Sequence, residues 1–177
     1  MSGPDKKVQV VISRDREHTG NGNRYGWFSV LVPYVSFVAV ISLAWEILQL
    51  PFYTIWREGS ASEIAFAVAH CTIGDLLIAL SALVVALILA RDAIWPKGSY
   101  ARVAMMTVIF GVLYTVFSEW VNVELRQGWA YSDLMPVIPI IGTGLSPVAQ
   151  WLVIPLAGIW WVRRRTVSVN YKVRESA

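Results

Sequence analysis

Four long apolar segments dominate this chain of 177 residues and constrain its fold more than any other feature. They cover about residues 27–50, 64–90, 103–121 and 145–162. Each approaches or exceeds the ~20 residues that an α-helix needs to cross about 30 Å of hydrocarbon. None of them shows the period-two alternation of strands in a membrane barrel. The sequence therefore predicts an all-α integral membrane protein, with four transmembrane helices in an antiparallel bundle.

The composition excludes several other classes of protein. Only 15% of the residues are charged and 56% are apolar, whereas soluble domains carry about 25% charged residues. This balance excludes a disordered chain and an ordinary cytosolic domain. The single cysteine, Cys71, excludes an intramolecular disulfide and dithiol redox chemistry. Two histidines are too few for a pair of bis-histidine haems, and no nucleotide-binding P-loop is present.

The basic residues predict the orientation of the chain in the membrane. Thirteen of the fifteen lysines and arginines precede the first segment, connect the second to the third, or follow the fourth. The other side carries only Arg57 and Arg126. By the positive-inside rule both termini are expected in the cytoplasm, in a bacterial-type inner membrane. The net charge of +3 then reflects this topology and anionic lipid head groups, and nucleic acid is not an expected partner.

The expected organisation is a cytoplasmic polar tail over residues 1–26, a four-span membrane domain over 27–165, and a second cytoplasmic tail over 166–177. Within the membrane domain, an outer connection covers about 122–144. It contains an apolar stretch interrupted by Pro136 and Pro139, so it cannot be a regular helix. Whether it re-enters the membrane stays open.

The start of the fourth helix has a sequence signal of its own. Ser146 is followed by Pro147. Serine is favoured at the N-cap of a helix and proline in its first turn. This pair therefore predicts Ser146 as the N-cap residue.

The polar residues inside the four segments gather toward one membrane leaflet, the outer one. Three acids are the only formal charges there, and no lysine or arginine lies within any segment. The candidate catalytic residues are Glu46, His70, Asp75 and Glu119. The candidate substrate-binding or supporting residues are Gln49, Asn122, Gln150, Trp45 and Tyr131. Helical spacing places Trp45, Glu46 and Gln49 on one stripe of the first helix, which agrees with a shared interior site.

Buried acids without a basic partner are costly, and ionisable residues inside a membrane are candidates for function. They either stay protonated or share a cation. His70 could act as an imidazolium partner or as a metal ligand. In a purely structural alternative, Glu46 and Glu119 reach the interface, and His70 and the amides hydrogen-bond between helices.

The sequence is compatible with three functions. The first is a membrane enzyme that uses acid/base or metal-assisted chemistry on a lipid or isoprenoid substrate. The second is a non-catalytic subunit of a membrane complex, with another membrane protein as its partner. The third is a module that binds or transports a divalent cation through Glu46, His70, Asp75 and Glu119. The expected partners are the lipid bilayer and, for an enzyme, a lipidic small molecule. A divalent metal is the one cofactor that the sequence suggests, as an alternative, and otherwise the cofactor is unknown.

Short motifs narrow the enzyme alternatives. The chain lacks the paired Glu-x-x-His of di-iron bundles, the His-Glu-x-x-His of zinc proteases and the Gly-x-Ser-x-Gly of hydrolases. The Ala44-Trp45-Glu46 tripeptide, with a second buried acid elsewhere, resembles the small membrane-embedded terpene cyclases, which protonate an isoprenoid with a carboxylic acid. The resemblance covers three residues, and those enzymes have more spans. It implies an acid role for Glu46.

Overall fold

The computed structural model of the chain describes residues 24–91, 95 and 98–175. The chain divides into two units, Met1–Pro33 and Tyr34–Ala177. The first unit contributes the beginning of one helix, up to Pro33. This helix continues through Pro33, which has no backbone N–H and so leaves one hydrogen bond of the helix unmade. Every feature of the site lies in the second unit.

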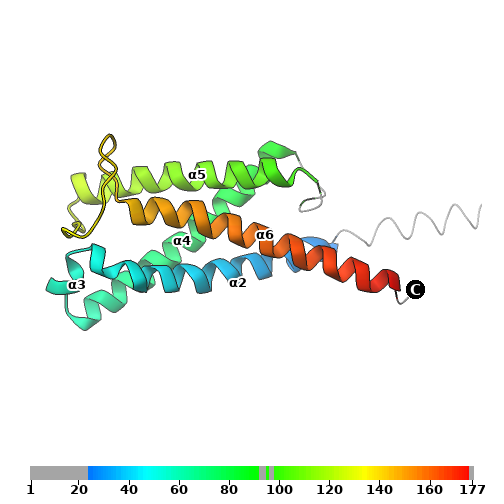
Figure 1. Ribbon diagram of the computed structural model, residues 1–177, viewed down its shortest axis with the longest axis horizontal. Helices are drawn as coiled ribbons and strands as arrows, with labels where there is room; N and C mark the ends of the chain where they lie inside the picture. Colours follow the sequence, from blue (N-terminus) through cyan, green and yellow to red (C-terminus); the bar gives the residue numbers. More distant parts are fainter. Residues whose placement is uncertain (1–23, 92–94, 96–97, 176–177) are drawn as a thin grey trace, which may run out of the picture. The chain divides into compact units, whose positions relative to one another are not determined.

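Four helices are long and apolar enough to cross a membrane, which confirms the predicted number of such segments (Figure 1). They are α2 (Arg24–Gln49), α4 (Ala61–Ala90), α5 (Tyr100–Trp120) and α6 (Leu145–Glu175). Three short elements join them: the 3-10 turn η1 (Leu50–Phe52), α3 (Ile55–Glu58) and the π-helical turn η2 (Val121–Leu125). The residues that the structure describes include no strand.

The helix bounds differ from the sequence expectation mainly at the C-terminal end. Helix α6 continues through Glu175, although residues 166–177 were expected to form a polar tail. The expected N-terminal tail over 1–26 lies almost entirely outside the described residues, since α2 begins at Arg24. Helix α4 begins three residues earlier than expected because Ser60 and Glu63 form a capping box. The Ser60 hydroxyl accepts a hydrogen bond from the backbone N–H of Glu63, and the Glu63 carboxylate accepts one from the backbone N–H of Ser60.

The predicted N-cap of the fourth helix is wrong. Helix α6 already begins at Leu145, so Ser146 lies in its first turn. The preceding connection sets this start, because the backbone N–H of Leu145 donates to the carbonyl of Pro136. The Ser146 hydroxyl is thereby free to donate to Gln49 Oε1 of α2 at 2.8 Å. The serine therefore joins two helices instead of capping one.

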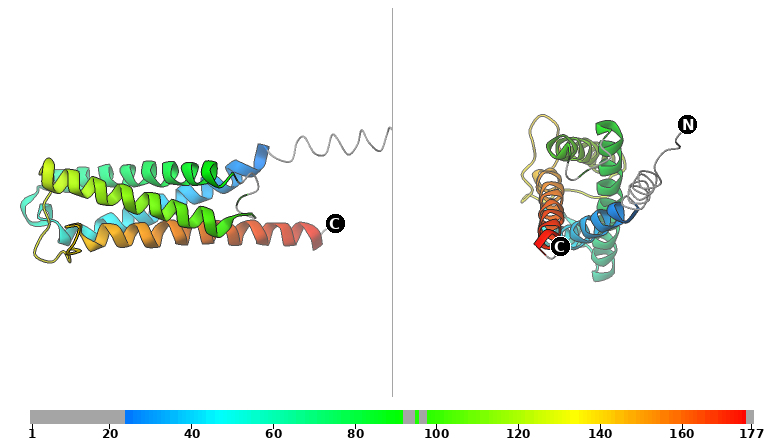
Figure 2. Two further views of the ribbon diagram at one scale, coloured as in Figure 1. Left: turned by 90° about the horizontal axis from the view of Figure 1, so that it is seen from above. Right: turned by 90° about the vertical axis from the view of Figure 1, so that its right-hand side faces the viewer.

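Helix α4 is inclined relative to α5 (Figures 1 and 2). We call the end formed by the connections 50–60 and 126–144 the distal end. There α4 begins beside α3, and at its opposite end it packs beside α5. Helix α5 packs against α6 as well, closely enough that Gly111 faces the ring of Trp151. The inclination of α4 separates the distal halves of α4 and α5.

The connection 126–144 is hydrogen-bonded to the segment that follows α2. The backbone N–H of Thr54 donates to the carbonyl of Ala130, and that of Ser132 donates to the carbonyl of Phe52. The Ser132 hydroxyl also donates to the carbonyl of Pro51 at 2.8 Å. The connection was expected to begin at 122, but η2 extends the helical stretch to Leu125. From 126 to 144 the chain forms no helix, in agreement with the expectation from Pro136 and Pro139. The hydrogen bonds to residues 51–54 hold this connection across the distal end.

Candidate functional site

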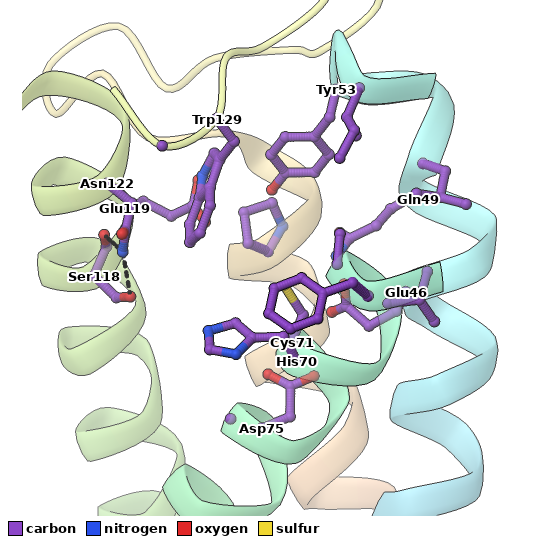
Figure 3. A pocket seen from close by; sticks show the side chains of 18 of the residues that line it. Glu46, Gln49, Tyr53, His70, Cys71, Asp75, Ser118, Glu119, Asn122 and Trp129 are labelled. Atoms are coloured by element: carbon purple, nitrogen blue, oxygen red, sulfur yellow. Dashed lines mark hydrogen bonds between the residues drawn. The ribbon is translucent and has the colours of Figure 1, made fainter. Parts of the chain in front are cut away.

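A cavity of about 990 Å³ lies at the distal end, and all four long helices contribute to its lining (Figure 3). The four candidate catalytic residues all line this cavity: Glu46, His70, Asp75 and Glu119. So do three of the five supporting candidates: Gln49, Asn122 and Gln150. Polar residues drawn from separate helices therefore meet at one place.

Glu46 and Asp75 form a carboxyl pair, although they come from different helices. Gln150 of α6 lies between them. Its Nε2 donates to Asp75 Oδ2 at 2.5 Å and to Glu46 Oε1 at 3.4 Å. The single Gln150 nitrogen thus brings the two carboxyl groups close to each other. Both side chains are 8% exposed. Because two like charges at such proximity repel strongly away from water, the pair favours the state in which one proton is shared.

Glu119 lies on the α5 wall of the cavity, opposite α2 (Figure 3). It is buried, and its Oε2 accepts a hydrogen bond from the hydroxyl of Tyr131. The same Tyr131 oxygen accepts from the backbone N–H of Gly144 at 2.9 Å. Burial, and then the bond to the carboxyl of Glu119, raise the pKa of Tyr131 above its usual value. The phenol therefore stays protonated and remains a hydrogen-bond donor throughout the physiological pH range.

The distal end of α5 changes its helical pitch beside Glu119. The turn η2 is π-helical, and the N–H of Arg126 donates to the carbonyl of Val121 at 2.8 Å. Single π-helical turns occur frequently at functional sites. On the turn, the amide of Asn122 donates to the carbonyl and to the hydroxyl of Ser118. These two bonds use the amide nitrogen of Asn122, so its amide oxygen is not a partner of Ser118.

His70 occupies a different environment from the three acids. It lines the cavity but is exposed, and its ring stacks on Phe66 with 5.6 Å between the centroids. Among the described residues, no group of three or more His, Cys, Asp or Glu side chains is placed to hold one metal ion. The four candidates therefore line one cavity as the pair Glu46–Asp75, the separate acid Glu119 and a histidine at the opening.

The two remaining supporting candidates, Trp45 and Tyr131, do not line the cavity. Tyr131 acts through its bond to Glu119. Helical spacing places Thr115 on the stripe of Glu119 and Tyr53 on the stripe of Glu46, and both residues line the cavity. Sequence reasoning missed Trp129, which also lines the cavity. Trp129 belongs to a connection, where helical spacing gives no signal.

We expect Tyr131→Phe to lower the stability of the protein by about 1–3 kcal/mol, because it leaves two buried hydrogen-bonding groups without their partner. These groups are the Glu119 carboxyl and the Gly144 N–H. The measurement is a thermal unfolding curve of the purified variant in detergent. Tyr114→Phe is the matched control, since Tyr114 is half exposed, and we expect a change within about 0.5 kcal/mol. Equal effects of the two substitutions would contradict this role of the Tyr131 hydroxyl.

The four apolar helices define the class of this chain as a multi-pass α-helical membrane protein. Many of their large apolar side chains point outward, as lipid contact requires; Leu48, Leu77 and Ile88 are each more than 50% exposed. Comparisons with protein-family models, with curated proteins and with solved structures each find no match for this chain.

Proposed function

We propose that the four helices form an antiparallel bundle across a bacterial-type inner membrane, with both termini in the cytoplasm and the distal end outside. The distribution of lysine and arginine supports this orientation, because the distal connections carry only Arg57 and Arg126. The cavity then opens in the outer leaflet.

This orientation predicts labelling of an exposed residue in the distal connection from outside the cell. Asp133→Cys, in a Cys71→Ala background, should react with a membrane-impermeant maleimide in intact cells, because Asp133 is exposed. A cysteine appended after Ala177 should react only after the cells are permeabilised. The reverse pattern would overturn the proposed orientation.

We further propose that the protein is a membrane enzyme that transfers protons to and from a lipidic substrate bound in the cavity. The observation that carries this proposal is the pair Glu46–Asp75, joined by the Gln150 amide at the cavity wall. A carboxyl pair that shares one proton offers both an acid and a base, and positioned acids and bases contribute about 10²–10⁴-fold to a reaction rate.

The cavity itself suits a substrate with a long apolar part. Its lining includes Phe66, Leu77 and Tyr114, which are at least half exposed on the side between α4 and α5. In a membrane, this side would face lipid chains. Pockets that bind lipidic molecules combine such apolar walls with a few polar groups of defined position.

We expect Glu46→Gln to abolish the reaction while leaving the fold intact, because the amide keeps the shape of the side chain but cannot carry a proton. The measurement is mass spectrometry of total lipids from a deletion strain complemented with either the wild type or the variant. Lipids that the wild type restores should stay at deletion levels with Glu46→Gln. Full restoration by this variant would overturn the proposed proton transfer.

A further inference from the structure

The α5 wall of the cavity offers hydrogen-bond acceptors and a hydroxyl without a partner. Thr115 is only 6% exposed and lines the cavity, yet its Oγ1 has no hydrogen-bond partner among the described residues. Thr107, two turns earlier on α5, donates to the carbonyl of Val103 instead. Glu119 and Asn122 line the cavity on the same helical stretch as Thr115. Since buried polar groups are normally paired, this wall lacks a polar partner that a bound ligand can supply.

The charge of the lining selects the kind of polar group that fits. Glu46, Asp75 and Glu119 are buried in the cavity wall, and Glu58 and Glu63 lie at its rim. Among the described lining residues, Arg126 is the only lysine or arginine. A phosphate or carboxylate head group would therefore be repelled by the negative charge of the lining. A protonated amine would be attracted by this negative charge, and its N–H groups would donate hydrogen bonds to the acceptors of the wall.

Aromatic rings at the same place favour a cation as well. Trp129 lies beside Glu119 at the top of the cavity, with Tyr53 next to it (Figure 3). The faces of indole and phenol rings attract ammonium groups, most strongly where water is excluded. The head-group end of the cavity is therefore acidic, rich in acceptors and aromatic, whereas the opening between α4 and α5 is apolar.

We propose that the cavity binds a single-chain amphiphile with a primary ammonium head group, which enters from the lipid between α4 and α5. Glu119 and Thr115 bind the ammonium group, and the hydrocarbon chain leaves the cavity past Leu77 and Tyr114. This assignment rests on the proposed function, because it places the substrate beside the Glu46–Asp75 pair.

The test is equilibrium binding of radiolabelled oleylamine to the full chain in phosphatidylcholine nanodiscs, with empty nanodiscs as the reference for partitioning into lipid. We expect saturable binding. Unlabelled oleylamine should displace the label, oleyl alcohol should require at least about tenfold more, and oleyl phosphate should fail. Binding of oleyl phosphate as tight as that of the amine would overturn the assignment, as would the absence of saturable binding.

Two matched pairs of variants locate the ammonium group. Glu119→Gln should weaken oleylamine binding at least about tenfold, while Glu124→Gln, on the exposed side of η2, should leave it unchanged. Thr115→Val should weaken it several-fold, while Thr107→Val should not, since Thr107 does not line the cavity. Unchanged affinity in both Glu119→Gln and Thr115→Val would place the amine elsewhere and refute the proposal.

The same experiments separate this inference from the proposed function. If oleylamine binds through Glu119 but Glu46→Gln restores the lipid profile, the cavity is a binding site and the proton transfer is refuted. If Glu46→Gln loses function but oleylamine does not bind, the enzyme stands and the amine assignment is refuted.

Discussion

Asp75→Asn should abolish the function of this protein while preserving its fold. Asp75 lies at the middle of α4, fourteen residues after its first residue, so its carboxyl cannot reach water along the helix surface. Asparagine keeps an oxygen that accepts from Gln150 Nε2, but it cannot take up or release a proton. We therefore expect a loss of activity of at least about 100-fold, the usual contribution of one acid or base.

We also expect Asp75→Asn to keep the stability of the wild type. An aspartate at the centre of a membrane helix costs roughly 2.5–3.5 kcal/mol on insertion scales, so its removal should not destabilise the bundle. Thermal unfolding of the purified variant measures its stability, and growth complementation of a deletion strain measures its function. Glu124→Gln is the control, because Glu124 is exposed and does not line the cavity. Full complementation by Asp75→Asn would make the acid structural, and a subunit of a membrane complex would replace the enzyme.

Gly111→Ala should lower the stability of the protein, because it forces a side chain into the contact between α5 and α6. A Cβ atom at Gly111 would overlap Cε3 of Trp151 and lie 2.8 Å from Cζ3 of the same ring. The indole ring belongs to α6 and is itself buried, so α5 and α6 would have to move apart. Overpacking of this kind costs about 1–3 kcal/mol. The melting temperature in detergent is the measurement.

Gly74 of α4 provides the matched control. A Cβ atom there meets nothing within 4 Å, because Gly74 lines the cavity. Alanine is favoured over glycine in a helix by about 1 kcal/mol, so Gly74→Ala should leave the stability unchanged or raise it. A drop in melting temperature with Gly74→Ala equal to that with Gly111→Ala would show that both effects come from the helix backbone and not from the contact with Trp151.

The membership of the site was largely predictable from the sequence. Glu46, Asp75 and Glu119 stand out because a lipid environment makes every charge within an apolar segment exceptional. The positions of the candidate residues along the four apolar segments also indicated that they lie toward the same side of the membrane. That these acids line one cavity agrees with the expectation of a shared interior site.

The contacts within the site were not predictable. Nothing in the spacing of residues indicates that Gln150 joins Glu46 to Asp75, or that Tyr131 reaches Glu119 from a connection. The stripe that contains Glu46 also contains Trp45, yet only the former lines the cavity. Ser146 was expected to cap α6 and instead bonds to Gln49.

The sequence by itself determined the number of membrane-crossing helices and the set of polar residues they bury, because hydrophobic length and the cost of buried charge act locally along the chain. The tertiary structure alone decided which of those residues touch. The rotation of each helix about its axis and the inclination of α4 depend on side chains from other helices, as where the ring of Trp151 lies against Gly111. Such contacts join residues far apart in sequence. Helical periodicity therefore indicates which face of a helix is polar, whereas only the packing of the helices determines which residues that face contacts.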